Sequence, residues 1–503
     1  MGWAVGARST TGLGYGPRGG PLTRLSGAST GRGVPAPQSD AVDTDICRRP
    51  ATELARRLRS RDIGAVELVD AHIERIERID GGINAIPTRS FERARREALA
   101  ADAALVRGDE VGPLHGLPIA FKDLQATAGI RTTMGSPLFT DWVPEADSLT
   151  VATLRAAGAI GIGKSNVPEM GAGSQTYNRV FGPTRNPYDP SLTPGGSSGG
   201  SAAALASGMI AIADGSDYGG SLRNPASFCN VAGFRPTIGL VPQEPSTGRA
   251  QGLSVTGPLG RTVGDVALVL GALVGRPIDA TPLDDGALRR MRVAIAPSFA
   301  GLPFDPAVRR AFAGVPAVIE AMGCRVEEAE PSMEGADEAF LATRHASFGD
   351  DIRQITGGDP ERLALVKPEL RWHVEQSLRI GPADIAAAER ARARIVDRFG
   401  AFMDGFDLLV LPVSQVPPFQ VELTWPREIG GIPMTDYLDW MRSCWYISLT
   451  GGPAASVPAT FVDELPFGVQ IVGPPGDDIG VLRFAAAYEV ASGEPWRRGP
   501  PTR

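Results

Sequence analysis

The chain is poor in the residues that metal and disulfide chemistry needs. Its 503 residues include only four histidines and four cysteines. The cysteines stand far apart and form no CxxC pair, so the sequence predicts neither a disulfide framework nor a zinc ribbon. The histidines fit no HExxH spacing, which argues against a metal hydrolase. Reduced thiols favour the cytoplasm, and we expect neither metal nor cofactor.

Clusters of positive charge and long apolar runs are lacking too. The net charge is −7, and no cluster of Lys and Arg stands in the body of the chain, so we expect no nucleic-acid partner. The longest apolar candidate, residues 202–213, is shorter than the ~18 residues of a membrane helix, so we expect no membrane partner. With 43% hydrophobic and 21% charged residues, the chain has the composition of a globular protein with a sizeable core.

The first forty residues differ from the rest. They are rich in Gly, Ser, Thr and Pro, carry several arginines and a single acid, Asp40, and lack the apolar stretch of a secretory signal. A transit leader would share this composition, but so would a disordered or over-extended start. We predict a disordered leader over residues 1–45, ahead of one domain over residues 50–500.

Hydrophobic periodicity predicts alternating helices and strands in this domain. The expected helices span residues 52–61, 65–79, 91–106, 148–157, 262–274, 307–322, 382–402 and 481–491. The expected strands span residues 118–123, 159–162, 209–213, 293–295, 325–326, 408–411, 456–457 and 468–472. With no internal repeat or linker, this alternation indicates a single large α/β domain.

Residues 158–165 match the phosphate-binding loop pattern GxxxxGK[ST]. Such a loop must follow a strand and open a helix, so that free backbone amides meet the phosphate. Here the residues before the motif look helical, and the motif itself looks like the strand. We therefore prefer to interpret Lys164 as the end of an ordinary element, with an ATPase as a weaker alternative.

A second pattern, GxSxG over residues 196–200, would make Ser198 the nucleophile of an α/β-hydrolase. That fold needs a strand directly before the serine and a downstream acid and histidine. The residues before Ser198 form a loop, and His345 and His373 stand in charged, helix-like stretches. This alternative is also weaker.

The third pattern is larger. Residues 195–201 read GGSSGGS, and residues 217–223 read DYGGSLR, which places Ser221 24 residues after Ser197. Glycines beside a serine let backbone N–H groups approach a substrate and point at one spot, as an oxyanion requires. A strand ending on Lys122 stands upstream. Each run alone could be a glycine-rich turn, but both together with this lysine favour nucleophilic chemistry.

At these residues the chain resembles the amidase signature family. Further matches in order are residues 118–123, the GKSN segment 163–166, RNP over 185–187, residues 228–237, GPLGR over 257–261 and GVQIVG over 468–473. The resemblance covers roughly residues 50–498. It implies the fold of that family, a central mixed, twisted β-sheet covered by helices in one large domain, and it accounts for the apparent phosphate loop.

The resemblance also implies roles. Ser221 would be the acyl-forming nucleophile, Ser197 the bridging serine that follows a cis peptide bond, and Lys122 the base. The backbone around Tyr218, Gly219 and Gly220 would form the oxyanion hole. A buried neutral lysine can relay a proton between hydroxyls without a histidine, provided that its pKa falls from ~10.4 towards neutrality. The alternative for Lys122 is a salt bridge to a neighbouring aspartate.

The substrate pocket is less defined. We expect Met170, Gly171, Tyr177 and Ser198 to contribute, and Trp440 and Trp445 either line the pocket or pack in the core. Tyr218 stands where relatives carry a smaller residue, so its ring could narrow the pocket. We expect an amidase that hydrolyses a small-molecule carboxamide to the acid and ammonia or an amine. The alternatives are a subunit of a tRNA-dependent amidotransferase and a non-catalytic scaffold. The chain could also form a homodimer.

Overall fold

The computed structural model describes residues 46–244 and 252–501, so the expected leader lies outside the described residues. The strands are β1 Thr88–Arg89, β2 Pro118–Lys122, β3 Ile160–Ser165, β4 Tyr177–Asn178, β5 Gly182–Pro183, β6 Ala213–Asp217, β7 Ala232–Arg235, β8 Val255–Gly260, β9 Arg292–Ile295, β10 Arg325–Glu328, β11 Leu408–Pro412, β12 Glu428–Ile429, β13 Ile432–Pro433, β14 Ala454–Val462 and β15 Leu465–Val472. The helices are α1 Ala51–Arg59, α2 Ala65–Ile79, α3 Phe91–Arg107, α4 Leu149–Ala156, α5 Gly199–Ala206, α6 Arg223–Phe228, α7 Val263–Val274, α8 Asp285–Leu288, α9 Pro306–Phe312, α10 Val315–Ala321, α11 Ala336–Thr356, α12 Pro360–Ala364, α13 Pro368–Ser377, α14 Pro382–Met403, α15 Arg442–Thr450, α16 Asp478–Ser492 and α17 Glu494–Arg497.

The centre of the molecule is a mixed β-sheet. Eight strands pair in the order β10-β9-β11-β15-β14-β7-β8-β6, and three more pair as β1-β3-β2. The two sheets meet where β2 runs beside β6, joined by a parallel bridge between Ile119 and Ile212 and a bond from the Ala211 N–H to the Pro118 carbonyl of 3.1 Å. We call this junction the β2–β6 seam. Because both strands run the same way there, the carboxyl ends at Lys122 and Asp217 lie at one edge of the sheet.

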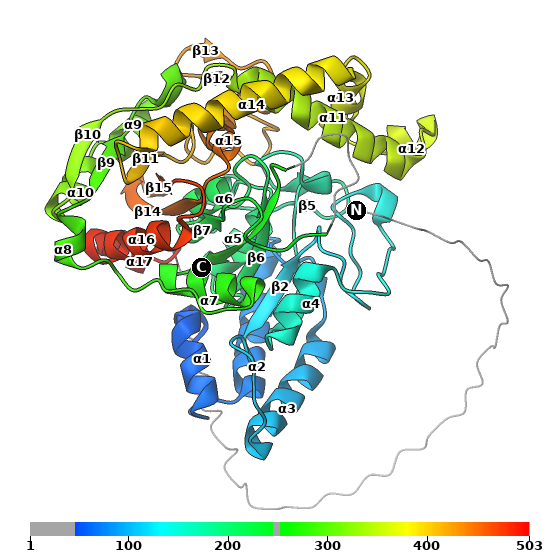
Figure 1. Cartoon of the computed structure of the whole chain (residues 1–503). Helices are drawn as coiled ribbons and strands as arrows, with labels where there is room; N and C mark the ends of the chain where they lie inside the picture. The colour runs from blue at the N-terminus through cyan, green and yellow to red at the C-terminus, as the bar shows by residue number, and fades with distance from the viewer. Residues whose placement is uncertain (1–45, 245–251, 502–503) are drawn as a thin grey trace, which may run out of the picture.

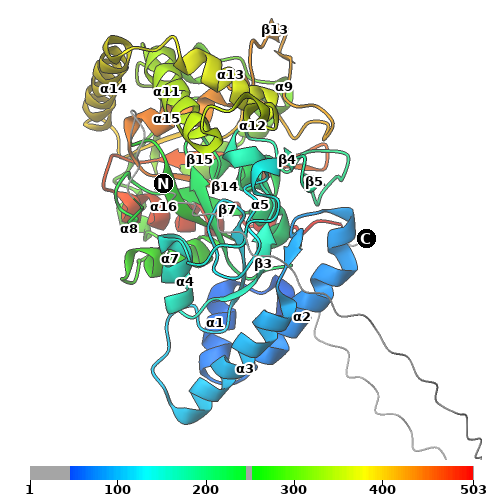
Figure 2. The ribbon, with the colours of Figure 1, turned by 90° about the vertical axis from the view of Figure 1, so that its right-hand side faces the viewer.

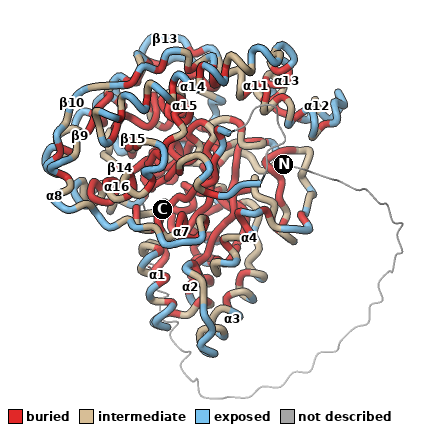
Figure 3. Tube along the Cα trace, in the orientation of Figure 1, coloured by how far each residue is buried: buried red, intermediate tan, exposed pale blue. Residues whose placement is uncertain are grey.

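Helices cover both faces of the sheet, as the burial of β11 shows. Leu408 and Val410 belong to the apolar cluster that also contains α1, α2, α7 and α16, whereas Leu409 and Leu411 belong to a second cluster with α11, α14 and α15. A strand buried on both faces reads as a continuous apolar run, which is how residues 408–411 appear in the sequence. Figures 1 and 2 show α1–α3 at one end of the molecule and α11–α14 at the other. Figure 3 shows the buried strands between them.

Two expected elements differ from the structure, and helices α11 and α13 had no predicted bounds. The strand expected over residues 209–213 begins only at Ala213, because Met209–Ile212 form the approach to the seam. The helix expected over 307–322 is interrupted at Gly314, giving α9 and α10. Helices α11 and α13, which contribute Arg344, His345 and His373, lack the clean apolar period that would locate them. Over residues 46–244 and 252–501, no helix is both long and apolar enough to cross a bilayer.

Candidate active site

Lys122 is fully buried at the end of β2. Its Nζ lies 2.9 Å from Ser197 Oγ, 2.8 Å from Ser198 Oγ and 2.9 Å from Ser216 Oγ. Among the described residues it forms no ion pair, and the carboxylate of Asp123 accepts from Thr133 instead. Burial lowers the pKa of Lys122 to about 7, although Asp214 and Asp217 partly oppose the shift. The shift favours the neutral amine, the form that a base requires.

The glycine-rich run before α5 brings Ser197 and Ser198 to this amine. The Gly196–Ser197 peptide bond is cis, as the family resemblance implied. The run packs closely against its neighbours: a Cβ added at Gly200 would lie 2.3 Å from the Asn166 backbone nitrogen, and one added at Gly199 would lie 2.2 Å from Thr176 Oγ1. Only glycine permits these approaches, which hold both serines against the end of β2.

Ser221 lies on the turn after β6, on the other side of the seam. The Ser198 N–H donates to the Ser221 carbonyl at 3.3 Å, which joins the two serine loops directly. Ser221 itself is half-buried. The structure thus brings Lys122, Ser197 and the Ser221 turn together, with Ser198 between them.

Asp217 holds the Ser221 turn in shape. Its buried carboxylate accepts from the backbone of Gly220 at 2.8 Å and Leu222 at 3.1 Å, and it pairs with Arg223 at 2.9 Å and Arg235 at 3.2 Å. Burial alone would raise the pKa of Asp217, but the two guanidinium groups outweigh it and hold the pKa below its ordinary range. Its role is to position the turn.

Asp217→Asn is expected to lower the stability of the fold by about 3–5 kcal/mol, because it leaves two guanidinium groups buried without their counterion. The measurement is the urea midpoint of unfolding, followed by circular dichroism. Asp141→Asn, at an exposed carboxylate, is the control and should shift the midpoint little. An Asp217→Asn midpoint equal to that of the control would contradict this account.

The backbone N–H groups of the predicted oxyanion hole differ in whether they already donate to an acceptor within the protein. The Gly220 N–H donates to Asp217, whereas among the described residues the N–H groups of Gly219 and Ser221 have no acceptor. A Cβ on Gly220, whose φ is +116°, would lie 2.6 Å from Cys444 Cβ, and one on Gly219 would lie 3.0 Å from Trp445 Cβ. Close packing on α15 therefore requires these glycines.

The Tyr218 ring packs away from the turn into an aromatic cluster. Its centroid lies 5.6 Å from that of Phe340 and 6.0 Å from that of Phe348. Trp445 stacks on Phe340 at 4.1 Å and donates its Nε1–H to the Leu438 carbonyl at 3.0 Å. Trp445 therefore belongs to the core, one of the two alternatives that its spacing left open.

The other predicted pocket residues lie in different surroundings. A Cβ on Gly171 would lie 3.6 Å from Ser197 Oγ, so Gly171 borders the serine loop. Tyr177 and Trp440 line a small pocket with Lys367, Glu369 and Tyr437. Trp440 is also 1% exposed and stacks on Phe228 in the core, so it both lines the pocket and packs in the core. The Met170 side chain packs against a small apolar cluster that contains Leu370 of α13.

The phosphate-loop pattern over residues 158–165 and the GxSxG pattern over residues 196–200 lack the surroundings that their motifs require. Residues 160–165 are strand β3 itself, and Lys164 is buried with Thr127 Oγ1 at 2.7 Å and Thr132 Oγ1 at 3.1 Å, so no phosphate loop forms. Ser198 Oγ contacts Lys122 rather than a histidine. His345 and His373 pair with each other at 2.8 Å on α11 and α13, so the histidine of an α/β-hydrolase is missing from Ser198.

Sequence reasoning missed several residues that shape the site. Ser216 contacts Lys122 from β6, and Asp214 Oδ1 accepts the Lys122 backbone N–H at 3.0 Å. A signal existed for both, because they alternate along a strand that leads to the Ser221 turn. Arg344 next to Tyr218 had no such signal, because its proximity depends on how α11 packs.

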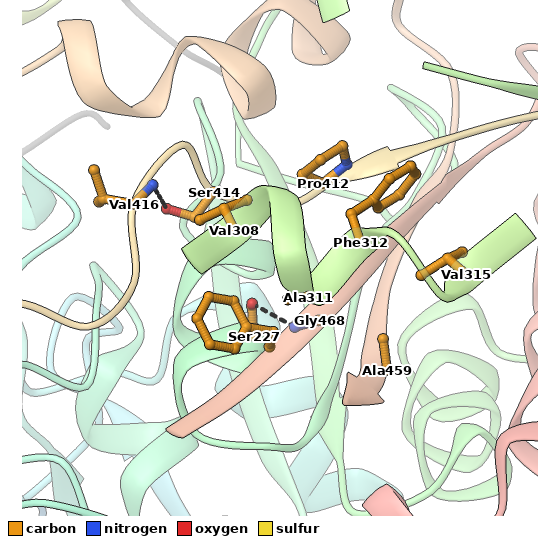
Figure 4. Close-up of a pocket in the computed structure, with 11 residues that line it drawn as sticks. Ser227, Val308, Ala311, Phe312, Val315, Pro412, Ser414, Val416, Ala459 and Gly468 are labelled. Carbon is orange, nitrogen blue, oxygen red and sulfur yellow. Dashed lines mark hydrogen bonds between the residues drawn. The ribbon is translucent and has the colours of Figure 1, made fainter. Parts of the chain in front are cut away.

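A separate hollow lies between α9 and the sheet, and Figure 4 shows its lining. It is apolar apart from Ser227, which accepts the Gly468 N–H at 2.8 Å, and Ser414, which accepts the Val416 N–H at 3.4 Å. None of its lining residues is charged or belongs to the predicted site, so it offers no groups for acyl transfer.

Comparison with known proteins agrees with this geometry. The family model described as Amidase matches residues 67–482. One of the subunits of the glutamyl-tRNA(Gln) amidotransferase of Moorella thermoacetica is 35% identical over 90% of this chain and 98% of its own. The crystal structure of a bacterial aryl acylamidase of the amidase signature family has a TM-score of 0.81 at 27% identity, covering 90% of this chain and 97% of that one.

A second solved structure, that of the corresponding glutamyl-tRNA(Gln) amidotransferase subunit from Thermotoga maritima, has a TM-score of 0.72 at 28% identity, covering 90% of this chain and 96% of that one. The match of the family model extends over most of the chain, and the single α/β domain with its mixed sheet is shared with these structures. The chain therefore belongs to the amidase signature family of enzymes, which act on the carbon–nitrogen bonds of amides.

Proposed function

We propose that the protein cleaves a carboxamide through an acyl-enzyme on Ser221 and releases ammonia or an amine. The observation that supports this most directly is the buried Lys122 amine, 2.9 Å from Ser197 Oγ, without an ion-pair partner among the described residues. A lysine held near neutrality beside a hydroxyl is equipped to move a proton.

In the proposed reaction, protons pass between Ser221, Ser197 and Lys122 in turn. As Ser221 Oγ attacks the amide carbon, its proton passes to Ser197 Oγ, and the Ser197 proton passes to Lys122 Nζ. The backbone N–H groups of Gly219 and Ser221 stabilise the oxyanion of the tetrahedral intermediate. When the carbon–nitrogen bond breaks, the protons return along the same path to the departing nitrogen. Water then repeats the attack on the ester and frees the carboxylic acid.

The test is a panel of aliphatic, aryl and amino-acid amides with ammonia or amine detection. The full chain is expected to release nitrogen and acid in equal amounts from at least one member, because each cycle breaks one carbon–nitrogen bond. The rate of release should fall by about 10²–10⁴-fold with Lys122→Met. Equal release by the two proteins, or none across the panel, would argue against the proposal.

A second candidate is supported by the curated relatives better than a free-standing amidase is. Those relatives are subunits of glutamyl-tRNA(Gln) amidotransferases, matched over nearly their whole length. On this reading the same site would deaminate an amide such as glutamine and pass ammonia to a partner protein. Tandem-affinity purification from the native cell decides: stable partner proteins and a strong preference for glutamine support this candidate, and a lone chain or homodimer that turns over other amides contradicts it.

A further inference from the structure

Arg344 is a buried cation without a counterion. It is 4% exposed on α11, and among the described residues it forms no ion pair within 4.0 Å. Aromatic rings surround its guanidinium carbon, with centroids at 4.1 Å for Phe348, 5.1 Å for Tyr218, 5.9 Å for Tyr437 and 6.0 Å for Phe340. We call these four rings the Arg344 cage. Ring faces attract a guanidinium, but they compensate its lost hydration only partly.

The polar groups around Arg344 supply no negative charge. Its Nη2 and Nε donate to Tyr437 Oη at 3.0 and 3.4 Å. Tyr437 Oη lies 2.5 Å from His373 Nε2, and the His373 ring continues to His345. Burial lowers the pKa of both histidines, that of His345 to about 4, and Arg344 adds to this shift. With both histidines neutral, Tyr437 can donate to His373 while it accepts from Arg344, so this hydrogen-bond network places no negative charge beside Arg344.

Two donors of the cage have no acceptor. Among the described residues, Arg344 Nη1 makes no hydrogen bond, and the buried hydroxyl of Tyr218 has no partner. A buried hydroxyl without a partner costs stability, and such groups are rare in native proteins unless a ligand or water meets them. An anion placed between these groups would satisfy both at once.

The cage lies next to the reacting centre. Phe340 precedes Arg344 by four residues of α11, about 6 Å along the helix. A Cβ on Gly219 would lie 3.2 Å from Phe340 Cζ, so this helix packs directly on the turn that carries Ser221. Tyr218 is three residues before Ser221, a span of at most roughly 10 Å. The Arg344 cage and the Ser221 turn therefore lie side by side, at a separation that matches a short carbon chain.

We propose that Arg344 binds a carboxylate on the substrate, so that the enzyme prefers amides whose acyl chain ends in a negative charge. This inference rests on the proposed function, because it takes Ser221 as the point of attack. Arg344 Nη1 and the Tyr218 hydroxyl donate to the carboxylate, and the rings exclude water from the pair. A charge-assisted pair of this kind tightens binding by roughly 10–100-fold over a neutral end group.

The experiment measures binding to the full chain carrying Ser221→Ala, which separates it from turnover. Isothermal titration compares ω-amide carboxylates of two to four methylenes (succinamate, glutaramate and adipamate) with the neutral diamides of the same length. We expect at least one acid-amide to bind tenfold or more tightly than its diamide. Arg344→Met should abolish that preference, and Arg344→Lys should retain part of it. Equal affinity for acid and diamide at every length overturns the inference even if no variant at 344 folds.

Two further results complete the test. In the protein with Ser221 intact, the ratio of kcat/KM for the preferred acid-amide to that for its diamide should fall about tenfold or more in Arg344→Met. A variant that loses both substrates equally would show that Arg344 serves the fold alone and would overturn the inference. Binding of the acid-amides without turnover of any amide would refute the proposed function and leave the carboxylate site standing.

Discussion

Ser221→Ala is expected to reduce kcat for amide cleavage by about 10⁴-fold or more, because it removes the oxygen that we propose forms the acyl-enzyme. Substrate should still bind, since the pocket and the backbone donors of Gly219 are unchanged. The measurement is ammonia release under saturating substrate. Ser227→Ala is the matched control, because Ser227 caps a backbone N–H of β15 and stands apart from Lys122. It should retain most of the activity.

Covalent labelling tests whether Ser221 or Ser198 is the nucleophile. A fluorophosphonate should add its mass to the peptide that contains Ser221, and Ser198→Ala should still be labelled there. Ser198 Oγ lies as close to the Lys122 amine as Ser197 Oγ does, so distance alone does not exclude Ser198 as the nucleophile. Labelling that follows Ser198 instead of Ser221 would overturn the assignment.

Lys122→Met is expected to lower kcat by about 10²–10⁴-fold, the usual contribution of a general base. Methionine fills a similar volume, and burying it avoids the cost of burying an amine, so the variant should fold. Lys164→Met is the control, since Lys164 is equally buried but donates to Thr127 and Thr132. It should lose stability by leaving those oxygens unpaired. Greater loss of kcat in Lys164→Met than in Lys122→Met would contradict the assignment.

The pH profile carries the signature of the same base. The neutral form of Lys122 accepts the proton, and burial places its pKa at about 7. Below that pH the amine is protonated, so kcat/KM should fall about tenfold per pH unit on the acid side and level off above it. The residual activity of Lys122→Met should lack this step. A rate in the unsubstituted protein that is flat down to acid pH would count against Lys122.

Much of the fold and of the site geometry could be predicted from the sequence, because the signals were local. The apolar run of β11, the ends of β2 and the glycines around Ser197 and Ser221 report directly on burial and close approach. The Lys122–Ser197 contact also followed from the family resemblance. The strand context of Lys164 was enough to reject a phosphate loop, since a fully buried lysine on β3 has no free amides beside it.

What could not be predicted depends on packing between distant segments. Arg344 meets Tyr218 only because α11 crosses the turn after β6, and no short-range pattern connects residues that far apart. The Asp217 pair with Arg235 likewise needs β6 and β7 in place. Trp440 and Trp445 show the same limit, because their spacing suits a core helix or a pocket wall. The packing of α15 on Gly219 places Trp445, and stacking on Phe228 places Trp440.

The β2–β6 seam has a consequence for how activity is acquired. Lys122 stands on one side and Ser216 and Ser221 on the other, and the bridge from Ile119 to Ile212 is what joins the strand edges there. Neither the three-stranded nor the eight-stranded sheet contains both the base and the nucleophile. In the proposed mechanism, the distance over which a proton must travel is thus fixed by how these two sheets dock. We therefore expect amide cleavage only after both sheets have folded and docked, so that activity would report complete folding.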